Sequence, residues 1–240
     1  APGSVPARAS CIRCSGGGLI SGVAACAKQI NPRIQIIGVQ AEGAPAIANS
    51  FRTGERTPSD TVHTIADGIA VKTPGEKTFE YIKQYVDRVV TVSDDEIASA
   101  VLLLLERCKQ VVETSGAAPL AAVLNNKVDV KGKKVVCVLS GGNIDVSFIH
   151  KIVEKGLITR CRQLKFSVLM PDAPGALEHF SHIVAQQNAN IILFQHDRVQ
   201  TDLEIGEAII HVVCEVGGVD HAKRLIDTLT DDGYNLIKMQ

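Results

Sequence analysis

Apolar residues in the first two thirds of the chain form short β-rich runs, separated by longer stretches with helical spacing. The runs are IQIIGVQ (34–40), DRVVTV (87–92) and the first part of KKVVCVLSGGNID (133–145). Short continuous apolar runs are typical of strands buried on both faces of a parallel sheet. We therefore predict three such strands in this part of the chain.

The stretches between these runs have the spacing of helices. Residues 19–30 show it and end at the turn signal NPR, and residues 116–124 show it again. Ser93 and Glu96 have the spacing of a capping box, which predicts a helix that begins there and continues to about Gln110. The alternation of strand and helix predicts an α/β layer built on a parallel sheet.

The pattern changes near residues 151–162, where a helical connector leads into elements of a different order. LKFSVLM (164–170) alternates as a strand does, and the following residues read as a turn and a helix with Pro174 near the first helical position. Two strands joined by the polar turn QTD, a helix and a last strand follow, at residues 190–199, 203–216, 220–233 and 234–239. The order β-α-β-β-α-β describes a small ferredoxin-like sandwich.

The composition is that of a folded protein with neither a nucleic-acid nor a membrane partner. Of 240 residues, 45% are hydrophobic and 21% charged, and the net charge of -1 comes without a Lys/Arg run. No apolar run approaches the ~20 residues that cross a membrane. The first ten residues lack the apolar core of a secretory signal. Seven widely spaced cysteines fit reduced thiols, so a cytoplasmic protein is expected.

Two residue pairs have a spacing that metal sites also use. Cys11 and Cys14 form a C-x-x-C pair, but without a second pair or a nearby histidine we favour two incidental thiols over zinc ligands. His179 and His182 are three residues apart on a predicted helix, where exposed histidines are favoured over a metal pair.

The stretch CSGGGLISG (14–22) is the first candidate for chemistry. Three glycines in a row lead directly into a helical pattern, so backbone N–H groups and the positive end of the helix can approach an anion closely. A phosphate-binding loop and a flexible helix-entry turn both fit this pattern. A phosphate loop should follow a buried strand, and residues 1–14 are a poor strand candidate because they are small, proline-containing and without periodicity.

Several motifs in the chain, taken in order, resemble one known family. SGGGLISG, IIGVQAEGAPA, TIADGIAVK, VSDDEIASA and VLSGGNID resemble the C-terminal part of the catalytic domain of threonine ammonia-lyase (threonine dehydratase). LKFSVLMPDAPGALEHFSHI is similar to the start of the regulatory ACT domain of that family. The resemblance covers residues 15–240. It implies a lyase of amino-acid metabolism, including isoleucine biosynthesis, that uses pyridoxal 5'-phosphate.

The resemblance also implies a fold and a domain organisation. The expected α/β fold is the C-terminal part of a fold-type-II pyridoxal-phosphate domain, a parallel sheet with helices, followed by a ferredoxin-like βαββαβ ACT domain. We expect an irregular leader at residues 1–14, a partial catalytic domain at 15–159 and a regulatory ACT domain at 160–240.

Residues that match the family's cofactor contacts can be carried over one by one. The loop that holds the cofactor phosphate corresponds to Ser15, Gly16, Gly17, Gly18 and Leu19. Serine stands where the family has glycine at the first of these positions, and its Cβ would be strained there if the backbone needed a positive φ.

Three further residues match contacts to the cofactor ring. Ser140, followed by Gly141, matches the serine that hydrogen-bonds the pyridine nitrogen, although a serine that caps the glycine turn fits the same pattern. A neutral hydroxyl does not hold that nitrogen protonated, which suits β-elimination. Glu113 matches a glutamate beside the ring, and an exposed charge at a helix end is the other interpretation.

The resemblance assigns two other sites. Glu42 and the carbonyl of Ala46 match a cation site of relatives, but Ala48 replaces the second carboxylate, which makes a divalent site doubtful. In the ACT segment, DAPGAL brings backbone N–H groups to a helix start, where an amino-acid carboxylate fits between two such domains, or where a helix cap binds nothing. The effector candidates are Gly175, Ala176, Leu177, Asn190 and Ile191.

As a function, the resemblance implies deamination of L-threonine to 2-oxobutanoate and ammonia, with L-serine to pyruvate as a side activity, in a homo-oligomer. The family's Schiff-base lysine lies in a Ser-Phe-Lys type motif, and no such motif occurs in these residues. We therefore expect no catalytic residue in this chain and no activity of the chain alone. The alternative is a non-catalytic subunit that senses an amino acid, or assists assembly, through its ACT domain.

Overall fold

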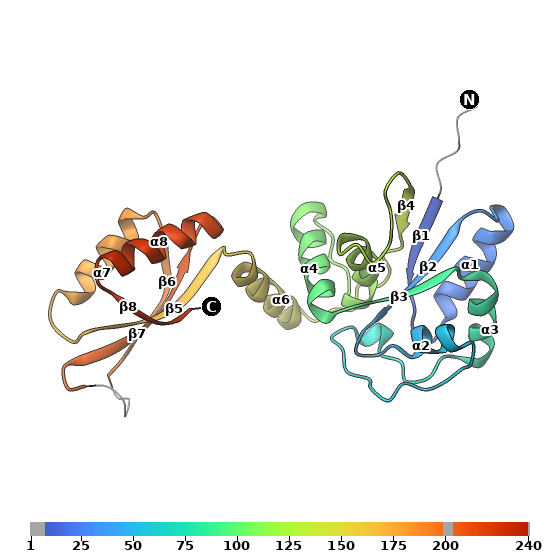
Figure 1. Ribbon diagram of the computed structural model, residues 1–240, viewed down its shortest axis with the longest axis horizontal. Helices are drawn as coiled ribbons and strands as arrows, with labels where there is room; N and C mark the ends of the chain where they lie inside the picture. Colours follow the sequence, from blue (N-terminus) through green and yellow to red (C-terminus); the bar gives the residue numbers. More distant parts are fainter. Residues whose placement is uncertain (1–7, 199–203, 240) are drawn as a thin grey trace. The chain divides into compact units, whose positions relative to one another are not determined.

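Two separate β-sheets organise the chain in the computed structural model, which describes residues 8–198 and 204–239 (Figure 1). The chain divides into two units, Ala1–Ile152 and Val153–Gln240. The division falls inside helix α6 (Val146–Thr159), whose last residue is the boundary expected from the sequence. Each unit has its own sheet and its own apolar core.

The first unit is built on a four-stranded parallel sheet with the order β3-β2-β1-β4. The three strands predicted from the apolar runs are present as β2 (Gln35–Ala41), β3 (Arg88–Val92) and β4 (Lys134–Cys137). Their β-branched residues suit a sheet that is covered on both faces.

The fourth strand, β1 (Arg8–Arg13), contradicts the irregular leader expected at residues 1–14. It lies between β2 and β4, and Cys11 pairs in register with Ile37 on one side and Cys137 on the other. Residues 1–7 lie outside the described part of the chain. The sequence RASCIR has no β-rich run, so local propensity gives no strand signal. Tertiary pairing on both sides overrides that propensity.

Helices cover both faces of this sheet. Ile12 and Cys14 pack with Ile20, Ile47 and Ile82 on the face that holds α1 (Gly18–Ile30), α2 (Ala46–Thr53) and α3 (Glu76–Tyr85). Helices α4 (Asp94–Leu103) and α5 (Thr114–Leu124) lie together on the other side, where α5 contacts β1, β2 and β3. The face of α5 toward the sheet is small, with buried Gly116, Ala117, Ala118, Ala121 and Ala122, so the helix packs closely on the strands.

For helix α4, the predicted start is confirmed, whereas the predicted end differs from the structure. Ser93 and Glu96 form the predicted capping box at the start of α4. The helix does not continue to Gln110, because a π-helical turn, η2 (Leu104–Cys108), follows α4 and Lys109 then adopts a left-handed conformation with φ 56°. Helices α2 and α3 and the short 3-10 helix η1 (Asp67–Ile69) have no counterpart in the sequence prediction.

The second unit has the predicted β-α-β-β-α-β order. Its antiparallel sheet has the strand order β6-β7-β5-β8, and Phe166, Phe180 and Ile210 lie in its core with residues of both helices. The elements are β5 (Gln163–Pro171), α7 (Ala176–Gln186), β6 (Asn190–Asp197), β7 (Glu207–Glu215), α8 (Val219–Asp231) and β8 (Asn235–Met239). The predicted turn QTD lies outside the described residues.

Among the described residues, no helix combines the length and the apolar character that crossing a bilayer requires.

Candidate functional site

The order of the strands in the first sheet reverses at one position. The chain passes from β1 to β2 to β3 in one direction and returns to place β4 on the other side of β1. In parallel α/β sheets, ligands bind outside the carboxyl ends of the strands where the order reverses in this way. The segments that leave β1 and β4 at this edge are the glycine loop and the turn that contains Ser140. The topology therefore brings two sequence-predicted parts of the site to one edge of the sheet.

The glycine loop is held from outside by the start of α3. The carbonyl oxygen of Gly16 accepts hydrogen bonds from Thr78 Oγ1 at 2.6 Å and from the Gly75 N–H at 3.1 Å. Gly17 caps α1 with φ 101°, and a Cβ there would lie 2.6 Å from Thr78 Oγ1. No side chain caps α1. The N–H groups at the start of α1, which include those of Gly18 and Leu19, are therefore available to an anion.

Serine at the first position of the loop fits without strain. The described non-glycine residues with positive φ are Lys109, Asn126, Cys161 and Asn188, so Ser15 has an ordinary backbone conformation. The strain considered for Ser15 from the sequence is therefore absent. The strand that a phosphate loop requires is also present, as β1.

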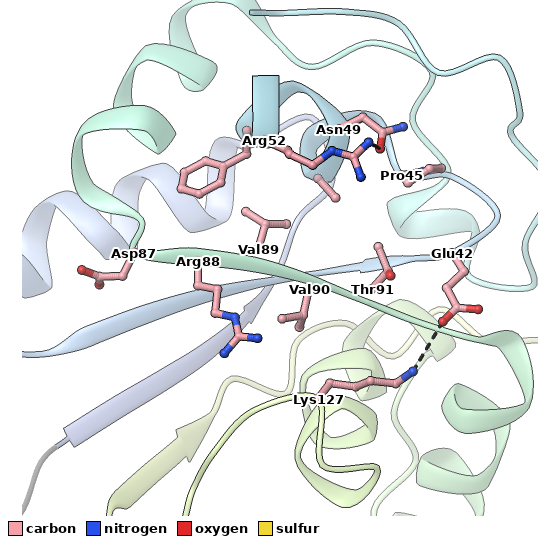
Figure 2. Close-up of a pocket in the computed structure, with 12 residues that line it drawn as sticks. Glu42, Pro45, Asn49, Arg52, Asp87, Arg88, Val89, Val90, Thr91 and Lys127 are labelled. Atoms are coloured by element: carbon pink, nitrogen blue, oxygen red, sulfur yellow. Dashed lines mark hydrogen bonds and ion pairs between the residues drawn. The ribbon is translucent and has the colours of Figure 1, made fainter. Parts of the chain in front are cut away.

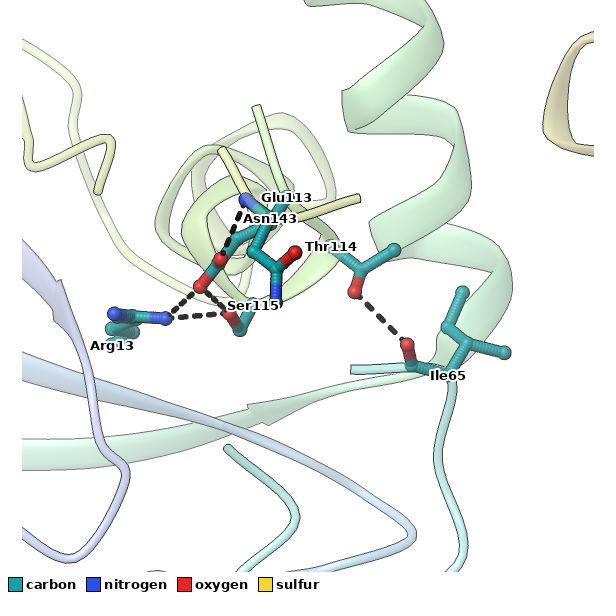
Figure 3. Close-up of polar contacts among 6 residues, drawn as sticks. All are labelled: Arg13, Ile65, Glu113, Thr114, Ser115 and Asn143. Atoms are coloured by element: carbon teal, nitrogen blue, oxygen red, sulfur yellow. Dashed lines mark hydrogen bonds and ion pairs between the residues drawn. The ribbon is translucent and has the colours of Figure 1, made fainter. Parts of the chain in front are cut away.

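A polar cluster forms at the end of β1, around Glu113. Arg13 pairs with the Glu113 carboxylate, and its Nη1 donates to Ser115 Oγ at 2.6 Å (Figure 3). Ser115 Oγ also donates to Glu113, and the Asn143 N–H donates to Glu113 Oε2 at 3.3 Å. Gly68 of η1 packs against this cluster, because a Cβ there would lie 2.4 Å from Ser115 Oγ. Four separate segments thus fix the position of one carboxylate.

The cluster keeps Glu113 ionised. Burial acts against the charged form, but the hydrogen bond from Ser115 and the charge of Arg13 outweigh it, so the pKa of Glu113 lies below its usual range. Glu113 is therefore an anion at neutral pH and not the exposed helix-end charge of the alternative interpretation, since its side chain is only 14% exposed.

Replacing Glu113 with glutamine is expected to lower the free energy of unfolding by about 2 kcal/mol at neutral pH, because the half-buried Arg13 loses its partner. Since the folded-state pKa of Glu113 is lowered, its contribution is complete above about pH 5 and is lost as the pH falls through the folded pKa. Urea unfolding of both proteins at several pH values measures this difference.

The matched control for this prediction is Glu80→Gln, because Glu80 pairs with Lys83 on the surface with a side chain that is 67% exposed. We expect a change within about 0.5 kcal/mol for that variant. A difference between Glu113→Gln and the wild type that stays constant down to about pH 3 would contradict the role of the Glu113 charge.

Ser140 carries a buried hydroxyl with no partner. Its Oγ atom is inaccessible to solvent and makes no hydrogen bond to a described residue. The Ser140 backbone lies against α5, because a Cβ on Gly116 would lie 2.1 Å from the Ser140 carbonyl oxygen. Gly141 has φ 86° and accepts a hydrogen bond from the Glu113 N–H at 3.2 Å. An unpaired buried hydroxyl costs free energy, so this atom is a candidate for contact with a ligand.

A cavity of about 570 Å³ lies beside this cluster in the first unit. Glu113 and Asn143 line it, whereas Ser140 and the residues of the glycine loop do not. The full lining is Ile65, Asp67, Gly68, Glu113, Thr114, Ser115, Asn143, Ile144, Asp145, Ser147 and Phe148. No lysine of the described residues belongs to it.

The predicted cation site at Glu42 lies elsewhere, in a cavity of about 750 Å³ along the edge strand β3 (Figure 2). Lys127 Nζ lies 3.5 Å from Glu42 Oε1 and 3.2 Å from Glu96 Oε1, so one ammonium group is shared between these two carboxylates. Ala46 is the first residue of α2 and is fully buried. Within the described ranges no group of three or more His, Cys, Asp or Glu side chains is suited to a metal ion. The cation site therefore stays a prediction without support from a ligand set.

In the two residue pairs whose sequence spacing suits a metal site, the side chains are not arranged around one ion. Cys14 packs with Ile12 on the α1 face, whereas Cys11 alternates to the other face of the sheet, so the two thiols cannot bind one ion. His179 bonds Asp232 at 2.7 Å, and His182 bonds Gln186 at 2.9 Å.

The predicted effector residues fall into two groups at opposite ends of the second sheet. Gly175, with φ 88°, caps α7 after the end of β5, followed by Ala176 and the 47% exposed Leu177. Asn190 and Ile191 begin β6 and pair with the end of β7, which pairs with the start of β5. Since a strand rises about 3.4 Å per residue, the length of β5 separates the two groups. One chain does not bring them together.

Sequence reasoning missed three residues of the cluster. Arg13 stands directly before the glycine loop, and its charge at the end of an unrecognised strand was the available signal. Asn143 lies in the quoted VLSGGNID motif, and Ser115 lies two residues after Glu113. Their roles depend on contacts between distant segments, which no local pattern contains.

A parallel α/β sheet with a glycine loop before a helix and a buried hydroxyl at its switch point is an arrangement typical of proteins that bind phosphorylated cofactors. A comparison with known families supports this interpretation of the fold. Residues 5–141 match the family described as pyridoxal-phosphate dependent enzyme. The chain belongs to this family of pyridoxal-phosphate enzymes.

Individual relatives are similar over most of the chain. The L-threonine ammonia-lyase of Thermotoga maritima is 45% identical over 221 residues, which are 92% of this chain and 55% of the relative. The L-threonine ammonia-lyase of Geobacter sulfurreducens is 44% identical over 91% of this chain and 54% of its own. The chain thus spans about half the length of the curated relatives it matches, and the match includes part of the second unit.

Solved structures agree with these relatives in fold. The processed form of threonine deaminase isoform 2 from Solanum lycopersicum is 37% identical with a TM-score of 0.58, covering 62% of this chain and 44% of that chain. Maize serine racemase is 36% identical with a TM-score of 0.56, covering 62% of this chain and 46% of that chain.

Proposed function

We propose that this chain provides the phosphate and ring-nitrogen contacts of a threonine ammonia-lyase, which converts L-threonine to 2-oxobutanoate and ammonia, and L-serine to pyruvate as a side activity. The observation that carries the proposal is the buried, unpartnered hydroxyl of Ser140 at the switch point of the sheet. The 45% identity to a relative named L-threonine ammonia-lyase supports the choice of reaction.

The residues present fit pyridoxal phosphate. The amides of the loop Ser15, Gly16, Gly17, Gly18 and Leu19 would bind the phosphate, since no side chain caps the helix that follows. Ser140 would meet the ring nitrogen with its free hydroxyl, and Gly141 leaves room for Glu113. When bound, the cofactor withdraws electrons from the α-carbon of an amino acid.

Each protein group has a defined part in such a site. The neutral Ser140 hydroxyl would hydrogen-bond the ring nitrogen without holding it protonated, which would suit elimination of the β-hydroxyl. Glu113 remains an anion because Ser115 and Arg13 stabilise its charge, so it supplies a fixed negative charge and not a proton. Arg13 fixes the Glu113 side chain at the end of β1.

We propose further that the chain alone does not catalyse the reaction. The family resemblance requires a lysine that links to the cofactor, and no described lysine lines the cavity beside Glu113. Purified chain incubated with pyridoxal phosphate and L-threonine should therefore release no 2-oxobutanoate. Turnover by this chain alone would contradict the proposed inactivity and leave the assignment of the cofactor contacts intact.

Binding of pyridoxal phosphate itself, measured by equilibrium dialysis, tests the cofactor contacts. We expect binding that is weakened about fivefold by Ser140→Ala, the loss of one hydrogen bond. Ser181→Ala, which removes a surface hydroxyl of the second unit, should leave binding unchanged. Pyridoxal without its phosphate should bind at least about tenfold more weakly, because the loop loses its ligand. Equal affinity for both compounds, or no binding, would overturn the proposal.

For the second unit we propose a regulatory ACT domain at which an amino-acid effector binds between two copies of the chain. The separation of Gly175 from Asn190 within one copy supports this, because a second copy is needed to combine them. If sensing is the whole function, the chain is a non-catalytic sensing or assembly subunit, which the lack of a described lysine in the cavity lining also favours. Calorimetry with isoleucine, valine and threonine tests the sensor, and the absence of heat with all three would count against it.

A further inference from the structure

Cys11 and Cys137 lie opposite each other on the two strands that lead to the site. They are in-register partners of the parallel pair β1 and β4, and the backbone pairing continues with Val138 N–H donating to the Cys11 carbonyl at 3.0 Å. Cys11 is fully buried, whereas Cys137 is partly exposed on an edge strand. Both are free thiols, and the Cys137 Sγ donates to the Pro119 carbonyl of α5 at 3.7 Å.

The spacing of the strands permits a covalent bond between these thiols. Adjacent strands lie about 4.8 Å apart, within the range of about 4.4–6.8 Å between the Cα atoms of disulfides. Parallel partners in register project from the same face of the sheet. The Cβ atoms of a disulfide are closer than the strand spacing, so β4 must move slightly toward β1. A bond that requires such a shift is more easily reduced than a structural disulfide.

The two thiols differ in reactivity in a useful way. The neighbouring Cys11 thiol lowers the pKa of Cys137 despite partial burial, whereas the pKa of Cys11 is raised by the Cys137 thiol beside it and by burial. Cys137 is thus the more readily ionised and the more accessible of the two thiols, which are the requirements for a nucleophile. Cys11 is poised beside it as the second, protected thiol.

We propose that Cys11 and Cys137 are a redox-modification site, which forms a reversible disulfide on reaction with a low-molecular-weight disulfide such as oxidised glutathione. The Cys137 thiolate attacks one glutathione sulfur, so the S–S bond breaks and one glutathione thiolate leaves. Cys11 gives its proton to a leaving glutathione thiolate and attacks Cys137, which releases the second glutathione. The two protein thiols are oxidised by two electrons, and the external disulfide is reduced to two thiols.

The modification would act on the strand ends that carry the candidate site. Cys11 precedes Arg13 on β1, and Cys137 precedes Ser140 after β4. A shift that brings the two sulfurs together therefore moves both sides of the switch point. The redox site itself rests only on the strand register and the thiols, and does not depend on the function proposed above.

Peptide mapping by mass spectrometry after treatment with oxidised glutathione, without reduction, tests the proposal. We expect a linked peptide pair that contains Cys11 and Cys137, with the loss of two hydrogen atoms, and its disappearance on reduction. Cys26 and Cys108 are exposed cysteines in the same protein and serve as internal controls, which should carry only glutathione. Modified controls without the Cys11–Cys137 link would overturn the proposal.

Two variants separate the role of Cys137 as the attacking thiol from that of Cys11 as the second thiol. In Cys11→Ser the second thiol is missing, so glutathione should accumulate on Cys137 and no linked pair should form. Cys137→Ser should leave Cys11 unmodified under the same conditions, because Cys11 is buried. Glutathione on Cys11 in that variant, or none on Cys137 in Cys11→Ser, would contradict the assigned roles. The wild-type mapping gives a result even if one variant does not fold.

Discussion

Replacing Gly116 with alanine is expected to lower the free energy of unfolding by about 3 kcal/mol. Gly116 lies in the first turn of α5, where the helix packs on the turn that contains Ser140. A Cβ at this position would lie 2.1 Å from the Ser140 carbonyl oxygen and 2.8 Å from Val112 Cγ1. The carbonyl belongs to the backbone, so relief requires α5 and the Ser140 turn to separate. Thermal or urea unfolding measures the loss.

The control for Gly116 is Gly22→Ala, because Gly22 is also inside a helix, α1, and a Cβ there meets nothing within 4 Å. In a helix without a clash, alanine is favoured over glycine, and Gly22→Ala should stabilise the protein by about 0.5–1 kcal/mol. If Gly116→Ala also stabilised the protein, α5 would not pack on the Ser140 turn as described. Weakened pyridoxal phosphate binding in Gly116→Ala alone would link this contact to the site.

Replacing Gly141 with alanine is expected to lower the free energy of unfolding by about 3 kcal/mol for two combined reasons. Its φ of 86° is a left-handed conformation that a side chain disfavours. A Cβ there would also lie 2.3 Å from the carboxyl carbon of Glu113, which would displace the carboxylate from Arg13 and Ser115. The pH dependence of stability that is due to Glu113 should shrink in this variant.

Gly132→Ala isolates the backbone contribution. Gly132 has a similar φ of 71°, but a Cβ there meets nothing within 4 Å. This variant should lose only about 1 kcal/mol from the left-handed conformation. Urea unfolding of the two variants at neutral pH gives the difference, which is the contribution of contacts around Glu113. Equal losses in both variants would show that the Glu113 carboxylate does not occupy the space above Gly141.

The elements with a local signal could be predicted from the sequence. The runs at β2, β3 and β4, the capping box of α4 and the βαββαβ order of the second unit follow from periodicity and caps, which depend on neighbouring residues. Strand β1 could not, because RASCIR has little β propensity and is held by pairing to β2 and β4. For the same reason the sequence showed no strand before the glycine loop, and only the sheet revealed it.

The candidate site likewise contains residues that sequence motifs predict and contacts that only the structure shows. Ser140, the glycine loop and Glu113 could be named from motifs, because each motif is a few contiguous residues. The pairing of Arg13 with Glu113 joins residues that are 100 positions apart, so no local pattern contains it. The separation of Gly175 and Asn190 could not be predicted from the sequence either, because it depends on the register of three antiparallel strands.

The sequence by itself determined the candidate residues for an anion site and a ring-nitrogen contact, and the order of most helices and strands, because these depend on backbone freedom and short-range periodicity. Only the tertiary structure decided that β1 and β4 meet where the strand order reverses. It also decided that Ser140 keeps a buried hydroxyl without a partner and that Cys11 faces Cys137. Such contacts join distant segments, and their positions are set by the packing of the whole sheet.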